Sequence, residues 1–157
     1  MGKYGIATIF ENSAVGYEFS ADNIPLHLSL IDSFEIAISL TEITAKINNL
    51  FVNQLPFQVS ITKDAFYGPA QDIPVSELEL TPNLANFHQS ILALLLAAGA
   101  SIKNPQFQGD GYRPHVSIYG DRRVTVGAIL KISQVSIAAK VSDAQDAKTK
   151  ILATIDF

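Results

Sequence analysis

Two short phrases of the same pattern carry the residues best suited to chemistry. His27-Leu28-Ser29-Leu30 and His115-Val116-Ser117-Ile118 each read histidine, apolar, serine, apolar, and each follows shortly after a proline. Alternate side chains of a β-strand share a face, so each histidine would stand beside its serine with the apolar residues behind. An imidazole can serve as acid or base near neutral pH, and a hydroxyl can donate to a developing oxyanion. Two such pairs of an imidazole and a hydroxyl could together cleave a phosphodiester without a metal.

A third histidine shares the pattern but not its periodicity. His88 is also followed two residues later by a serine, Ser90, but it lies in the segment 82–98, whose apolar residues have helical spacing. Residues two apart on a helix point about 200° apart, so Ser90 cannot stand beside His88. The intervening Gln89 is polar as well. We interpret His88 as a boundary residue of a helix.

Three alternatives to a shared catalytic site fit part of the pattern. One His-x-Ser phrase alone is more often a strand with polar residues facing outward, but two with matching flanks, 88 residues apart, favour a shared site. Two histidines could bind zinc, yet neither strand supplies the Asp, Glu or Cys that usually completes the shell, and Asp32 has an odd offset from His27 that predicts the opposite face. A serine-hydrolase triad is disfavoured because the chain has no Gly-x-Ser-x-Gly turn. We therefore expect no metal.

The charges are distributed unevenly along the chain. Residues 1–100 carry three lysines against ten acids, and residues 101–157 carry eight basic residues against five acids. All three arginines, Arg113, Arg122 and Arg123, bracket the second phrase. They indicate either a solvated loop or a local positive field for a phosphate, and charge alone does not decide between them. The net charge of −4 argues against binding long duplex nucleic acid, so a small nucleotide or an RNA end is the better partner.

The elements that must position these residues can be expected from periodicity and turn signals. Thr41 is a plausible N-cap, Pro82 suits a first helical turn, and Gly99 suits a helix end. The expected strands are 3–10, 15–19, 26–31, 58–62, 75–80, 115–119 and 129–141, with a mixed strand-like end at 147–157, and the expected helices are 41–52 and 82–98.

This order of elements favours an α+β fold over a doubly wound one, because strands and helices do not alternate and no glycine fingerprint is present. We expect one domain over residues 1–157, made of two similar lobes that each contribute one His-x-Ser strand. The longest apolar stretch is too short to cross a bilayer, no signal peptide is evident, and the chain has no cysteine. We therefore expect a cytoplasmic protein that does not associate with membranes. We also expect it to be a monomer.

The paired phrases resemble the two signature motifs of the two-histidine (2H) phosphoesterase superfamily, which includes the RNA 2′,3′-cyclic phosphodiesterases, also called 2′-5′ RNA ligases. Tyr112-Arg113-Pro114 before His115 looks like the family's aromatic-x-Pro lead-in, and the helix at 82–98 and the closing strands from Ile132 to Phe157 are also similar. The resemblance covers most of the chain. Residues 11–25 depart from it, because they are too short and too β-like for the full helix that many members carry there.

The resemblance implies a bilobal fold with two antiparallel-sheet lobes, helices outside and a central cleft. It implies that His27 and His115 are the catalytic pair, that Ser29 and Ser117 bind the phosphate, and that no cofactor is needed. By strand alternation Tyr119 shares the face of His115 and would contact the phosphate or stack on a base.

Arg113 is expected near the rim of that cleft. Three functions follow as hypotheses: a phosphodiesterase acting on 2′,3′-cyclic phosphate ends or small cyclic nucleotides, a non-catalytic nucleotide- or RNA-end-binding module with the same cleft, and a plain structural or partner-binding domain.

Overall fold

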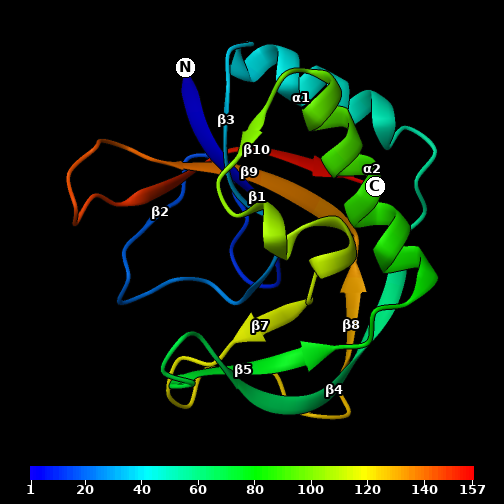
Figure 1. The fold of residues 1–157 in the computed structure, drawn as a ribbon, viewed down its shortest axis with the longest axis vertical. Helices are drawn as coiled ribbons and strands as arrows, with labels where there is room; N and C mark the ends of the chain where they lie inside the picture. The colour runs from blue at the N-terminus through cyan, green and yellow to red at the C-terminus, as the bar shows by residue number, and fades with distance from the viewer.

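The computed structural model describes all 157 residues as two antiparallel sheets and two helices (Figure 1). The strands are β1 (Gly2–Ile9), β2 (Glu18–Phe19), β3 (His27–Ile36), β4 (Phe57–Tyr67), β5 (Ile73–Leu78), β6 (Ser101–Ile102), β7 (His115–Ser117), β8 (Ile129–Ile132), β9 (Gln134–Lys140) and β10 (Thr149–Asp156). The helices are α1 (Leu40–Leu50) and α2 (Pro82–Ala97), with single 3₁₀ turns at Pro105–Phe107 and Gly109–Gly111. The expected α+β, two-lobe architecture is confirmed.

The larger sheet has the strand order β2-β10-β9-β1-β3-β6 and carries the first histidine phrase. β1 and β3 are antiparallel neighbours, with Ile9 opposite His27 and Ala7 opposite Ser29. Their pairing is interrupted near Gly5, where an added Cβ would lie 2.8 Å from the backbone oxygen of Asp32. Glycine is therefore needed at this bulge, because the backbone of β3 approaches too closely for a side chain.

The smaller sheet has the order β7-β5-β4-β8 and carries the second phrase. β4 and β5 form the expected hairpin, although β4 continues to Tyr67, beyond the expected end. β7 is shorter than the strand expected over 115–119 and ends at Ser117. After it the chain turns back through a single bridge between Tyr119 and Arg122.

The two helices begin at side-chain caps. Thr81 caps α2. The start of this helix at Pro82 and its end before Gly99, which adopts a φ of +88°, are as expected from the sequence. The expectation that Thr41 caps α1 is wrong. Ser39 is the cap, since its hydroxyl accepts from the backbone N–H of Glu42, and the helix starts one residue earlier than expected.

The late strand expected over 129–141 is two strands in different sheets. β8 pairs with β4 in the smaller sheet, while β9 lies between β1 and β10 in the larger sheet. Ser133 separates them, so the chain crosses from one sheet to the other with almost no loop, as the continuous path of β8 and β9 in Figure 1 shows. Apolar alternation continues through this crossing because both strands contribute to one core. The strand expected over 15–19 is likewise reduced to Glu18–Phe19.

One hydrophobic core serves both sheets. It includes Leu28 and Leu30 of β3, Val116 of β7, and Ile91 of α2, each almost completely buried. Aromatic rings close the junction: Phe87 of α2 packs against rings from the end of α1, from β4 and from the C-terminus. The two motif strands therefore rest on the same packed interior. Neither helix is long and apolar enough to span a membrane.

Candidate functional site

Both histidine phrases begin a strand, and both show the expected alternation. His27 and Ser29 are half-buried on one face of β3, whereas Leu28 and Leu30 are buried on the other. β7 repeats the arrangement, with His115 and Ser117 half-buried and Val116 buried. β3 and β7 lie against each other, although they belong to different sheets.

Each histidine ring is anchored in the same way. Nδ1–H of His27 donates to the carbonyl of Pro25 at 2.8 Å, and Nδ1–H of His115 donates to the carbonyl of Arg113, also at 2.8 Å. A carbonyl can only accept, so the proton of each neutral ring resides on Nδ1 and Nε2 carries the lone pair. Neither Nε2 has a hydrogen-bond partner within the protein. Both rings thus keep one nitrogen available to take or give a proton.

The electrostatic environment of His27 favours its neutral form. Burial holds the pKa of His27 below its ordinary value, and the nearby charge of His115 lowers it further. The hydrogen bond to Pro25 and the charge of Asp32 oppose this shift without cancelling it. The charge of His115 therefore reaches His27, in keeping with the contact between β3 and β7.

Asp32 is not on the opposite face, as strict alternation predicts. The alternation of β3 is interrupted at the bulge, where Leu30 and Ile31 are buried in succession and Asp32 is exposed. Asp32 consequently lines the same groove as His27 and Ser29. Its charge acts on His27 from there. A bulge cannot be located from a single strand pattern, which explains why the expectation was wrong.

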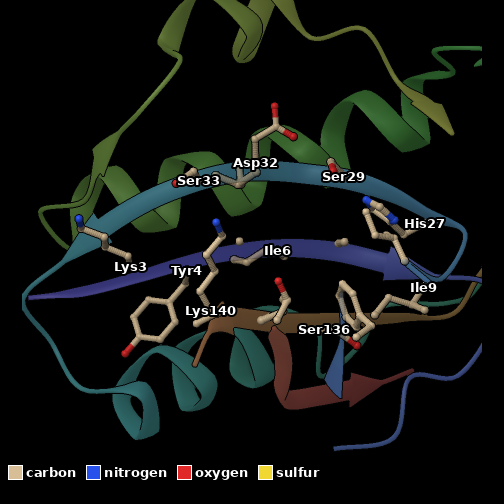
Figure 2. Close-up of a pocket in the computed structure, with 18 of the residues that line it drawn as sticks. Lys3, Tyr4, Ile6, Ile9, His27, Ser29, Asp32, Ser33, Ser136 and Lys140 are labelled. Carbon is tan, nitrogen blue, oxygen red and sulfur yellow. The ribbon is translucent and has the colours of Figure 1, made fainter. Parts of the chain in front are cut away.

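A groove of about 570 Å³ extends from His27 over the concave face of the larger sheet (Figure 2). His27 and Ser29 lie at one end, and Lys3 and Lys140 project from β1 and β9 at the other, as Figure 2 shows. The floor between them is made of small side chains. It includes Gly5, Ala7, Ser136 and Ala138. This groove can accept a flat or extended group attached to a phosphate at His27.

His115, on the strand that faces β3, is bordered by a cluster of aromatic and charged side chains. The ring of Tyr67 packs edge-on against His115 with centroids 4.8 Å apart, and its hydroxyl donates to Glu77 at 2.6 Å. Arg113 lies over the Tyr67 ring at 4.2 Å and pairs with Glu77 at 3.5 Å. These bonds hold the pKa of Glu77 below its usual range, chiefly through the Tyr67 hydroxyl. Lys63 also pairs with Glu77, at 3.6 Å.

Tyr67 and Glu77 are site residues that the sequence did not reveal. Glu77 lies directly opposite His115 across the β5–β7 pairing, and Tyr67 reaches it from β4. The available signal was an alternating pair of strands before α2, but their register with β7 depends on the fold. Pairing between such distant segments cannot be read from one chain.

All three arginines have carboxylate partners. Arg113 pairs with Glu77, Arg122 pairs with Glu11 at 2.7 Å, and Arg123 pairs with Asp64 at 2.6 Å. Arg122 also donates to the carbonyl of Ile24 at 2.9 Å, which connects the segment after β7 to the segment before β3. The arginine charges are therefore partly compensated within the protein, since Glu77 is shared by Arg113 and Lys63, and Arg122 connects two segments of the fold.

Tyr119 lies beyond the end of β7 but is still close to Ser117, as expected. Burial raises the pKa of Tyr119, while the neighbouring Ser117 hydroxyl and the charge of Arg122 act in the opposite direction. The guanidinium carbon of Arg122 lies 5.9 Å from the centroid of the Tyr119 ring. The structure thus brings Tyr119 to Ser117, though by a turn rather than by continued strand alternation.

His88 is not a boundary residue. It is only 2 % exposed and packs under the loop that precedes the second phrase, with its Nδ1–H donating to the carbonyl of Leu30 at 3.0 Å. The apolar periodicity of α2 did not reveal this, because a buried histidine with both nitrogens satisfied looks like any polar residue in the pattern. The structure contains no group of three or more His, Cys, Asp or Glu residues placed to hold a metal ion.

The site and fold together define a class of protein. Residues 12–148 match the model of the 2′-5′ RNA ligase superfamily, which covers most of the chain, and the protein belongs to this family of 2H phosphoesterases. No curated protein sequence matches it significantly.

Several solved structures share the fold. The chain is similar to TT0787 of Thermus thermophilus (12% identity, TM-score 0.59) and to Escherichia coli LigT complexed with 3′-AMP (14%, 0.56), covering 99% of this chain and 97% of that chain in each case. It is also similar to a protein described as a phosphoesterase (14% identity, TM-score 0.56, with 100% and 99% coverage). These similarities establish the two-lobe fold over the whole chain.

Proposed function

We propose that the protein is a metal-independent phosphodiesterase that hydrolyses 2′,3′-cyclic phosphate RNA ends or small cyclic nucleotides. The observation that carries this proposal is the matched anchoring of His27 and His115, each with Nδ1 fixed on a carbonyl two residues earlier and Nε2 left available. Acid–base catalysis at a phosphodiester needs one group to accept a proton and another to donate one. The pair supplies both.

We assign His27 as the general base. Burial and the nearby His115 both favour its neutral form, which has a lone pair on Nε2. In the proposed reaction, water gives a proton to Nε2 of His27 as its oxygen bonds to phosphorus. The bond from phosphorus to one ribose oxygen breaks, and that oxygen receives the Nε2 proton of protonated His115. Solvent exchange then restores both rings.

Ser29 and Ser117 are proposed to bind the non-bridging oxygens. Each hydroxyl stands two residues after a histidine on the same face of its strand, half-buried and next to the reacting group. Donors aimed at oxygens that gain charge stabilise the transition state more than the ground state. Tyr119, close to Ser117, is proposed to contact the phosphate or stack on a base, and Arg113 remains a proposed rim residue.

A nucleotide suits the groove beside His27. LigT, whose fold this chain shares, has been solved with 3′-AMP, NADP⁺, ATP and phosphate. In the present chain a base or ribose would lie on the small-residue floor, and Lys3 and Lys140 would be near any further negative charge. We propose a small nucleotide or an RNA end as the partner.

The first test is turnover of a panel of cyclic mononucleotides, cyclic oligonucleotides and RNA ends with a chelator present. We expect ring opening, and we expect His27→Ala and His115→Ala each to reduce kcat by about 10²–10⁴-fold, since each removes one proton-transfer group. Ser29→Ala and Ser117→Ala should reduce it less, with exposed Ser101→Ala as the matched control.

The outcomes separate the proposed functions. Full turnover in both histidine variants would show that the histidines are not the acid and base. Saturable binding of a nucleotide without product would instead indicate the non-catalytic binding module. Absence of both binding and turnover across the panel would leave a structural or partner-binding domain.

A further inference from the structure

A buried pair of rings connects the two histidine phrases behind the cleft. His88 of α2 donates from Nδ1–H to the carbonyl of Leu30 at 3.0 Å and accepts at Nε2 from the backbone N–H of Gly109, also at 3.0 Å. Tyr112 stacks on His88 with ring centroids 3.8 Å apart and planes 3° from parallel. We call His88 and Tyr112 the clasp.

The hydroxyl of Tyr112 completes the connection. It donates to the carbonyl of Ser29 at 2.8 Å, and Tyr112 itself lies three residues before His115. The clasp therefore ends on two successive carbonyls of the first phrase and is continuous with the second phrase through the short segment 112–115. It joins residues that are 58 and 83 positions apart in the chain.

These bonds fall where no strand can supply them. The outer edge of β3 pairs with β6 only at Phe34 and Glu35, so the edge near Ser29 has no strand neighbour. Side chains of the clasp provide donors to this part of β3 instead. A buried phenylalanine at either position would fill similar space, but it could not make a directional bond to β3. The hydrogen bonds of His88 and Tyr112 thus fix the position of β3, whereas the rings alone would supply only packing.

We propose that His88 and Tyr112 are positioning residues, which hold the strand of His27 and Ser29 at the distance and angle from His115 that proton transfer through one phosphate requires. This inference rests on the proposed acid–base function. Neither residue touches the reacting atoms. Arg122, which bonds to Glu11 and to the carbonyl of Ile24, ties the segment before β3 independently, so loss of the clasp should misalign the histidines without separating them.

The decisive variant is Tyr112→Phe, which removes one oxygen and keeps the stacked ring. We expect kcat to fall by about ten- to a hundredfold with KM changed less than about twofold, because the phosphate still binds but the two imidazoles are misaligned. Tyr17→Phe is the matched control and should retain wild-type kcat, because it removes the hydroxyl of a tyrosine that packs on Phe19 and belongs to neither histidine phrase.

Variants of His88 separate its two bonds. His88→Asn can keep the donor to Leu30, His88→Gln can keep the acceptor for Gly109, and His88→Phe keeps neither. We expect His88→Phe to lose the most kcat and His88→Asn to recover part of it, since the bond to Leu30 is the one that reaches β3. Ile91→Val on the same helix loosens the core, keeps both clasp residues and serves as the control for general loss of packing.

A readout independent of turnover distinguishes failure of this inference from failure of the proposed function. NMR titration of the His27 ring, with and without His115→Gln, measures how strongly the two imidazoles interact. The clasp predicts a smaller interaction in Tyr112→Phe than in the Tyr17→Phe control, even if no substrate is turned over. Unchanged kcat in Tyr112→Phe, or, for an inactive protein, an unchanged interaction, would overturn the positioning role.

Discussion

At the scale of residues, the backbone decides what the imidazoles can do. The carbonyls of Pro25 and Arg113 each receive Nδ1–H, so each ring is oriented and its tautomer is set before any substrate arrives. This is a preorganised arrangement, because neither imidazole has to exchange its anchor to leave Nε2 available. The surroundings of the two rings differ. His27 is half-buried and within reach of the charges of Asp32 and His115, whereas His115 is bordered by Tyr67.

The pKa of His27 should respond to removal of its partner. In His115→Gln we expect the pKa of His27 to rise, since the charge of His115 lowers it, but to remain below its ordinary value because burial is the larger cause. Titration of the His27 ring by NMR measures this directly, with Tyr17→Phe as a comparison outside the two phrases. A pKa that falls or does not move would show that the two rings do not share a site.

The pH dependence of kcat/KM should also reflect the lowered pKa of His27. A base with a lowered pKa keeps its lone pair at more acidic pH, so the acid limb of the kcat/KM profile should lie below about 6.5. Measured profiles of wild type and His115→Gln would show the limb moving to higher pH in the variant, provided residual turnover is measurable. An acid limb above the ordinary histidine value would contradict the assignment of His27 as the base.

At the scale of elements, the bulge between β1 and β3 shapes the groove. It brings Asp32 to the groove side and requires a glycine opposite, because the Asp32 carbonyl occupies the space of a Cβ at Gly5. Local patterns predicted β1, the β4–β5 hairpin and the start of α2 at Pro82, since these depend on alternation and on residues that favour a helix start. They did not predict the bulge, the division of 129–141 into β8 and β9, or the role of His88, since these depend on which distant strands pair.

Gly5→Ala should therefore lower the stability of the protein and also lower kcat, because the bulge shapes the groove. We expect it to lower the free energy of unfolding by about 1–3 kcal/mol, as overpacking of a close backbone contact does. Thermal or urea unfolding measures the loss. Gly99→Ala, strained by its positive φ at the end of α2 but in open space, is the control and should cost about 1 kcal/mol with little change in kcat. If Gly5→Ala and Gly99→Ala had equal effects on kcat, the bulge would have no specific influence on the site.

At the scale of the whole molecule, two half-buried or buried histidines couple folding to pH. The pKa values of His27 and His88 are both lowered, chiefly by burial. In the unfolded chain each would return to about 6.5, so below that pH the unfolded state binds more protons than the folded one. Their contribution to stability is present above about pH 6.5 and is lost as the pH falls toward the folded-state values.

Unfolding measured between about pH 5 and pH 7 tests this coupling. We expect the free energy of unfolding to decrease with acidity in the wild type and to decrease less steeply in His88→Gln, which has no titrating ring at that position. His27→Gln should reduce the slope in the same direction. Identical slopes in all three proteins would show that other groups control the acid sensitivity.

The crossing of the chain between the two sheets at Ser133 has a consequence for folding. From N- to C-terminus the chain enters the larger sheet three times and the smaller sheet twice, and β9 inserts between β1 and β10 only near the end. Most of its strand partners are distant in sequence, a topology that slows folding. The smaller sheet is complete only with β8, and the larger sheet only with β10. Because each sheet needs strands from the C-terminal part of the chain, both sheets are completed only after these distant segments have paired.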